Sequence, residues 1–161
     1  MAATMHTKGF SATMGCGRAL APLLAAGDVL LLSGDLGAGK TQLTKGIAEG
    51  LGVVEPITSP TFNILLVHEG RIPLYHFDLY RLDHAAQLED LDYWATIEAD
   101  GVAVVEWGDR FAEARPLDGI AVTLTIEGDD ERCISLEPLG ERGRELAEAW
   151  ALACRGLEGV G

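Results

Sequence analysis

The segment that most constrains this chain runs from Gly34 to Thr41, with the sequence GDLGAGKT, and fits the pattern G-x-x-x-x-G-K-[ST]. Glycines in such a segment let the backbone turn tightly and bring its N–H groups close to phosphate oxygens. Lys40 adds a positive charge near the outer phosphates, and the Thr41 hydroxyl can ligate Mg²⁺. We therefore expect a nucleoside triphosphate to be bound by Asp35, Leu36, Gly37, Ala38, Gly39, Lys40, Thr41 and Gln42.

The residues on either side of this segment support the same interpretation. The apolar run 29–32 is typical of a buried parallel strand. Residues 41–51 have helical periodicity, with Leu43 and Ile47 on one face, and Gly52 is a stop signal. Strand, glycine-rich loop and helix in this order place bound phosphates at a helix N-terminus, where the helix dipole favours anions.

The glycine spacing also separates this loop from other nucleotide-binding patterns. The glycines are spaced G-x-x-G-x-G, whereas dinucleotide-binding folds use G-x-G-x-x-G. The chain has no Asn-Lys-x-Asp segment of the kind that guanine-specific loops carry. Adenine is therefore the expected base, and ATP with Mg²⁺ the expected ligand.

Composition limits the remaining function classes. With 161 residues, of which 48% are hydrophobic, the chain is expected to form one domain, residues 1–161, with a substantial core. No apolar run approaches the roughly 18 residues of a membrane span, and the N-terminus lacks the apolar segment of a signal peptide. Cys16, Cys133 and Cys154 are widely separated and suit a reducing compartment, so we expect a cytoplasmic protein without membrane contact.

Net charge bears on nucleic-acid binding. Twelve Lys and Arg residues stand against 25 Asp and Glu residues, which gives a formal net charge of −13. A protein that binds a polyanion needs many cations to displace its counterions. The sequence therefore predicts that any RNA involved in this protein's function is held by a partner protein.

The order of predicted elements indicates the fold class. Besides the strand and helix around the glycine-rich loop, we expect helices at 11–26, 84–99 and 141–154, a strand at 102–105, and hairpins formed by 63–68 with 72–78 and by 119–126 with 133–136. Pro22 should interrupt the first of these helices. This order predicts an α/β, P-loop NTPase-like three-layer fold, whose central sheet is mostly parallel and carries antiparallel strands at its edges.

Hydrolysis of a bound triphosphate also needs a metal clamp and a group that positions water. Asp78 and Glu106 each end a predicted strand, and ligands of open α/β sheets lie at the carboxyl ends of strands. Strand alternation puts His76 on the same side as Asp78. No histidine has metal-ligand spacing, so each is expected to be packed or solvated. Thr61 lies in the loop that follows the predicted helix 41–51, and it could sense the outermost phosphate of a bound triphosphate.

Four segments resemble the TsaE (YjeE) family of small bacterial ATPases, which act in biosynthesis of threonylcarbamoyladenosine in tRNA. They are SGDLGAGKTQLTKGIAEGLG, ITSPTF, YHFDLYRL and VEWGDRF, and they lie in the family order within residues 27–111. Gly108 and Asp109 depart from the family pattern, which usually has proline or alanine and then glutamate after the Glu-Trp pair.

The resemblance implies a role for several of these residues. It implies that Gly37, Gly39 and Lys40 hold phosphates, that Thr41 and Glu106 bind Mg²⁺ directly or through water, and that Asp78 lies near the metal. The predicted catalytic residues are thus Glu106, Asp78 and Lys40, and the predicted metal ligands are Thr41, Glu106 and Asp78. Thr61 would belong to a switch-like loop, and Thr13 and Arg132 would touch the nucleotide.

The resemblance also implies partners, namely a complex of TsaD- and TsaB-type proteins that modifies tRNA and that ATP hydrolysis resets between turnovers. tRNA would be contacted only through that complex. Two alternatives stay open at this point. One is a small P-loop kinase, which would need an acceptor pocket and an arginine-bearing lid. The other is a nucleotide-gated binding module without catalysis, in which Glu106 would be expendable.

Overall fold

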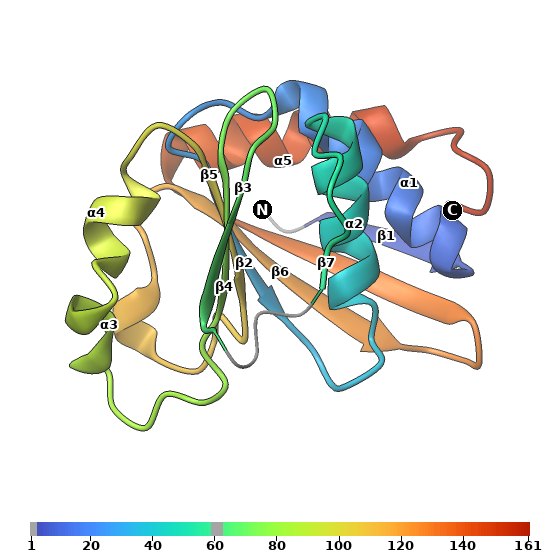
Figure 1. The fold of residues 1–161 in the computed structure, drawn as a ribbon. Coiled ribbons are helices and arrows are strands. Elements are labelled where there is room, and N and C mark those ends of the chain that lie inside the picture. Colours follow the sequence, from blue (N-terminus) through green and yellow to red (C-terminus); the bar gives the residue numbers. More distant parts are fainter. Residues whose placement is uncertain (1–2, 59–62) are drawn as a thin grey trace.

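A single seven-stranded sheet organises the molecule. The computed structural model describes residues 3–58 and 63–161. The strands lie in the order β1-β7-β6-β2-β5-β4-β3 (Figure 1). Their bounds are β1 Ala3–Lys8, β2 Val29–Ser33, β3 Leu65–His68, β4 Leu74–Asp78, β5 Val102–Glu106, β6 Gly119–Ile126 and β7 Glu131–Leu139. The adjacent strands β6, β2, β5 and β4 are parallel, whereas β7 joins β6 and β3 joins β4 antiparallel.

Helices cover both faces of this sheet. One face carries α1 (Phe10–Leu20), α2 (Lys40–Gly50) and α5 (Gly140–Cys154), and the other carries α3 (Gln87–Asp90) and α4 (Tyr93–Ile97), which lie at the left in Figure 1. Short 3₁₀ turns follow α1 at Ala21–Leu23 and precede β6 at Ala112–Ala114. The predicted three-layer α/β fold, with a parallel centre and antiparallel edges, is confirmed.

Alternating residues of the central strands feed two separate hydrophobic cores. Leu30 and Leu32 of β2 pack under α1, α2 and α5, whereas Val29 and Leu31 pack under α3 and α4. This is the two-sided burial expected of a parallel strand enclosed by helices, and it explains why 29–32 is apolar at every position. Trp150 of α5 is fully buried in the first core, where its Nε1–H donates to the Cys16 carbonyl at 2.8 Å.

Helices α1 and α2 pack with their backbones in close contact, because glycines stand where they cross. A Cβ atom built on Gly17 would lie 2.4 Å from the Leu43 carbonyl oxygen. One built on Gly46 would lie 2.0 Å from the Met14 carbonyl oxygen. Both distances are far below van der Waals contact, so α2 is fixed against α1 at a separation that only glycine permits.

Three elements differ from the sequence-based predictions. The first helix begins at Phe10, ends at Leu20 and continues as the 3₁₀ turn Ala21–Leu23, since Pro22 interrupts it as expected. The helix predicted at 84–99 is two short helices, separated where Asp92 adopts a φ of 52°. The strand β1 is an addition that the pattern did not indicate.

The strand β1 owes its position to a long-range pairing. It lies antiparallel to β7, with His6 opposite Cys133, and turns Met5 and Thr7 toward the helices. Its alternating polar residues carry little strand signal of their own, so the partner strand determines the conformation.

Within residues 3–58 and 63–161, none of the helices has the length and hydropathy that crossing a membrane requires.

Candidate functional site

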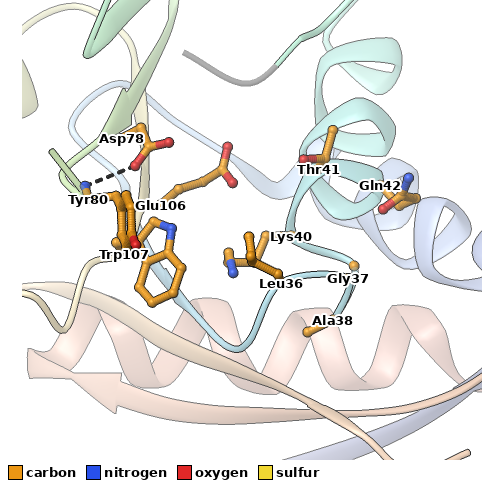
Figure 2. A pocket seen from close by; sticks show the side chains of 11 residues that line it. Leu36, Gly37, Ala38, Lys40, Thr41, Gln42, Asp78, Tyr80, Glu106 and Trp107 are labelled. Atoms are coloured by element: carbon orange, nitrogen blue, oxygen red, sulfur yellow. Dashed lines mark hydrogen bonds between the residues drawn. The ribbon is translucent and has the colours of Figure 1, made fainter. Parts of the chain in front are cut away.

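A cavity of about 520 Å³ opens at the carboxyl ends of β2, β4 and β5. Figure 2 shows the lining side chains, with the glycine-rich loop and the start of α2 on one side and the ends of β4 and β5 on the other. The lining residues are Leu36, Gly37, Ala38, Gly39, Lys40, Thr41, Gln42, Asp78, Tyr80, Glu106 and Trp107. The cavity thus brings together residues from three segments that are far apart in the sequence.

The loop from β2 to α2 needs glycine at defined positions. Gly34, Gly37 and Gly39 have φ values of 146°, 81° and 109°, which side-chain-bearing residues rarely adopt. A Cβ atom on Gly34 would also lie 2.5 Å from the Leu124 carbonyl oxygen. Gly39 directly precedes α2, so the unpaired N–H groups of the first helical turn face the cavity beside Lys40 and Thr41. This arrangement suits an anion.

Lys40 lies folded against its own loop. Its Nζ donates to the carbonyl oxygen of Gly34 and, at 3.3 Å, to that of Asp35, and it lies 4.5 Å from the centroid of the Trp107 ring. Burial lowers the pKa of the Lys40 ammonium, and the negative charges of Glu106 and Asp78 oppose that shift. Contacts with the loop carbonyls and the Trp107 ring thus hold the Lys40 side chain at the cavity wall.

The two predicted acids come from neighbouring strands and lie side by side. Asp78 ends β4 and Glu106 ends β5, and the two residues are paired across the parallel strands. Each is only 3% exposed. The backbone N–H of Tyr80 donates to Asp78 Oδ1 at 3.0 Å, and the imidazole of His76 contacts Glu106. In Figure 2 the Glu106 carboxylate is directed across the cavity toward Thr41.

These donors form a set that suits a hard divalent cation. The Thr41 hydroxyl and the Asp78 and Glu106 carboxylates offer oxygen ligands, which Mg²⁺ prefers. All three line the same cavity, next to the N-terminus of α2. The residues present therefore fit Mg²⁺ bound together with a phosphate chain.

Comparison with known proteins identifies the family. The family model described as "Threonylcarbamoyl adenosine biosynthesis protein TsaE" matches residues 7–134, a span that contains the loop and both acids. The chain belongs to the TsaE family. The resemblance found in the four sequence segments is thereby confirmed.

Individual TsaE proteins are similar in sequence to this chain over most of their length. The tRNA threonylcarbamoyladenosine biosynthesis protein TsaE of Bacillus subtilis is 43% identical over 136 residues, which are 81% of this chain and 85% of the relative. The protein of the same name from Streptomyces coelicolor is 45% identical over 134 residues, 78% of this chain and 90% of the relative. The crystal structure of Bacillus subtilis YdiB superposes with a TM-score of 0.80 at 33% identity, covering 94% of this chain and 95% of that one.

Two further site residues suggested by the TsaE resemblance lie behind the loop. Thr13 is fully buried, its hydroxyl shares a hydrogen bond of 2.9 Å with that of Thr7, and its methyl group lies under Gly39. Arg132 donates to the Gly37 carbonyl at 3.1 Å and to the Gly128 carbonyl at 2.9 Å. Neither residue lines the cavity; each touches the loop from the protein side.

Asp35 and Thr61 are the remaining residues of the predicted site. Asp35 lies beside the cavity, in an adjoining hollow that it shares with Trp107 and Asp109. Thr61 lies outside the residues that the structure describes, and its predicted role stays a prediction.

Sequence reasoning assigned no role in the site to Tyr80, His76 or Trp107. The Tyr80 and Trp107 rings lie 4.9 Å apart at the cavity wall, and Trp107 has a φ of 57°. A bulky residue rarely adopts that conformation, which turns the chain sharply after Glu106. The alternation that placed His76 on the Asp78 side was the available signal for His76.

Gly108 packs so closely that a Cβ there would lie 2.6 Å from that of Leu31.

Proposed function

We propose that this chain is a Mg²⁺-dependent ATPase that acts in biosynthesis of threonylcarbamoyladenosine in tRNA. The observation that carries the proposal is the cavity itself, in which the glycine-rich loop with Lys40 faces two buried carboxylates. The pathway is inferred from membership of the TsaE family, which is named for that biosynthesis. ATP, Mg²⁺ and hydrolysis are inferred from the chemistry of the lining residues.

Each lining residue has a distinct task in this proposal. The loop N–H groups and the α2 N-terminus bind the phosphate oxygens, and Lys40 moves from the loop carbonyls to the outer phosphates when ATP enters. Thr41, Glu106 and Asp78 would hold Mg²⁺, which supplies neutralisation of phosphate charge when bound. Glu106 or Asp78 also orients the attacking water. The buried setting strengthens these interactions, since little solvent screens them.

The proposal extends to partners. We infer that the ATP-bound protein docks on a complex of TsaD- and TsaB-type proteins and that hydrolysis resets this complex between turnovers. Such coupling needs a segment that differs between the ATP and ADP states, because a ligand shifts an equilibrium only by its differential affinity. Thr61 is the candidate for that segment. The net charge of −13 supports contact with tRNA through the complex rather than directly.

The cavity lining favours the ATPase over the kinase alternative. Kinases of this fold need cations beyond the loop lysine to hold the transferred phosphoryl group. Among the residues that the structure describes, Lys40 is the only cationic side chain lining the cavity. The adjoining hollow contains one cation, Arg115, which is ion-paired with Glu137 and lies together with Asp35 and Asp109.

Product analysis tests the proposal. The protein is incubated with γ-labelled ATP and Mg²⁺, alone and with the TsaD–TsaB-type complex, and the label is followed over time. An ATPase releases free phosphate, and we expect release to increase when the complex is present. Label that appears on a small-molecule acceptor would support the kinase instead. Binding of ATP without any release would support a non-catalytic binding module.

A further inference from the structure

A buried histidine contacts the carboxylate to which the proposed function assigns the metal. His76 on β4 has its Nε2 atom 2.5 Å from Oε2 of Glu106 on β5. His76 is fully buried and Glu106 is 3% exposed. A carboxylate that binds a metal only accepts hydrogen bonds, so in the proposed site Nε2 would be the donor. Because both side chains are buried, little water can compete for this hydrogen bond.

Strand register explains how the ring reaches Glu106 from behind. His76 is paired with Val104 across the parallel strands, and Asp78 is paired with Glu106 two residues nearer the strand ends. His76 is not among the residues that line the cavity. The Glu106 carboxylate, in contrast, lines the cavity and is directed toward Thr41 (Figure 2). His76 thus touches Glu106 from the interior and has no contact with the ligand space.

The state of the other ring nitrogen indicates that packing alone does not explain why a histidine occupies position 76. Its Nδ1 is buried and has no hydrogen-bond partner in the part of the chain that the structure describes. Burying an unpaired polar atom costs free energy that an apolar side chain of similar size would avoid. What the imidazole adds over leucine at this position is the hydrogen bond to Glu106.

We propose that His76 is a positioning residue, which holds the Glu106 carboxylate in the orientation that binds a divalent cation beside Thr41. Outer partners of this kind fix the direction of metal ligands, and their removal commonly weakens metal binding by about 10- to 100-fold. This inference rests on the proposed function, since it requires Mg²⁺–ATP in the cavity.

Nucleotide affinity measured with and without metal tests the inference independently of turnover. ATP is titrated calorimetrically into the full chain in EDTA and in excess Mg²⁺, and the ratio of the two Kd values gives the gain due to metal. We expect His76→Leu to lose most of the wild-type gain while leaving the Kd in EDTA unchanged. His76→Gln carries an amide N–H near the position of Nε2 and should recover part of the gain.

His68 offers a matched control. It is also a buried histidine of the same sheet, its Nδ1 contacts Glu55, and its Nε2 likewise has no partner in the described part of the chain. It does not line the cavity. His68→Leu should therefore keep the wild-type ratio, even if it lowers the temperature of unfolding to the same extent as His76→Leu.

The possible outcomes separate this inference from the proposed function. A wild-type protein whose ATP affinity does not respond to Mg²⁺ would overturn the metal site and the inference together. A wild-type gain that persists in His76→Leu, or a glutamine variant as deficient as the leucine variant, would overturn the inference alone. Should His76→Leu fail to fold, His76→Asn takes its place against His76→Gln, because its shorter amide does not reach Glu106.

Discussion

At the scale of single residues, the cavity is arranged around one cation. Lys40 is tied to the carbonyl oxygens of its own loop and covered by Trp107, and two buried carboxylates face it. Anionic phosphates can replace the loop carbonyls as acceptors, and charge-assisted hydrogen bonds are stronger than neutral ones. Exchange of partners by Lys40 is thus the step by which the loop would recognise a nucleotide.

We predict that Lys40→Ala weakens ATP binding by about 10- to 150-fold, because a charge-assisted contact contributes roughly 1.5–3 kcal/mol. Calorimetric titration with ATP measures the change. Lys45→Ala is the control, since it removes the same charge from the same helix and Lys45 does not line the cavity. Wild-type affinity in a folded Lys40→Ala protein would refute the assignment of the phosphate loop.

We predict that Glu106→Gln slows hydrolysis strongly and, like His76→Leu, reduces the gain in ATP affinity due to Mg²⁺, while it leaves the Kd for ATP in EDTA unchanged. The substitution keeps the size of the side chain but removes the charge that would hold metal or orient water. Phosphate release is measured with the partner complex present, alongside the Kd for ATP. If the rate is unchanged, the catalytic role passes to Asp78, the paired residue on β4.

The residues of the cavity show what a sequence can and cannot specify. The loop was predictable because its spacing encodes a backbone conformation, and Asp78 and Glu106 because acids that end strands share one edge of the sheet. The expectation of a packed or solvated histidine agrees with the burial of His76, but its contact with Glu106 could not be predicted, since that contact depends on β4 lying next to β5. Neighbour order in a sheet is a tertiary property that local pattern does not contain.

At the scale of elements, the site depends on how closely α2 is fixed to α1. Helix α2 begins at Lys40, so its position determines where the loop N–H groups point. The glycines at the crossing, Gly17 and Gly46, allow carbonyl groups to occupy the space of a side chain. A displaced α2 would therefore change stability and nucleotide binding together.

We predict that Gly17→Ala destabilises the protein by about 1–3 kcal/mol, because its Cβ would overlap the Leu43 carbonyl and force the helices apart. Gly15→Ala on the same helix should instead stabilise by about 0.5–1 kcal/mol, since among the described residues only the Arg18 side chain, at 3.8 Å, lies within contact distance of a Cβ there. Urea unfolding of both variants checks the contrast. Equal effects of the two substitutions would contradict close packing of α1 on α2.

Element boundaries were predictable where local signals dominate. Pro22 ends α1 and Gly52 follows α2, each for a reason internal to the backbone. The prediction of one continuous helix at 84–99 was wrong. Apolar residues at helical spacing persist across Asp92, but the left-handed conformation of Asp92 separates α3 from α4. Strand β1 was missed because β7, far along the chain, supplies its hydrogen bonds.

At the scale of the whole molecule, net charge and fold are the informative properties. The net charge of −13 disfavours direct binding of a long polyanion such as tRNA. The agreement with YdiB extends over 94% of the chain, so the whole sheet, and not the loop alone, follows the TsaE-family fold.

We predict that the isolated chain does not bind tRNA with submicromolar affinity near physiological salt. Without a broad cationic surface, the release of counterions that drives such binding is small. Titration of labelled tRNA, followed by fluorescence anisotropy, measures this directly. Submicromolar binding that weakens steeply with salt would contradict the charge argument.

The central claim is that ATP turnover in this cavity supports modification of tRNA. Transfer of the threonylcarbamoyl group to tRNA by the TsaD–TsaB-type complex, followed over several turnovers with wild type or Lys40→Ala, tests it most directly. We predict that wild type sustains repeated turnover and that Lys40→Ala stops near one equivalent per complex, because the complex is not reset. Equal yields with the two proteins would contradict the account.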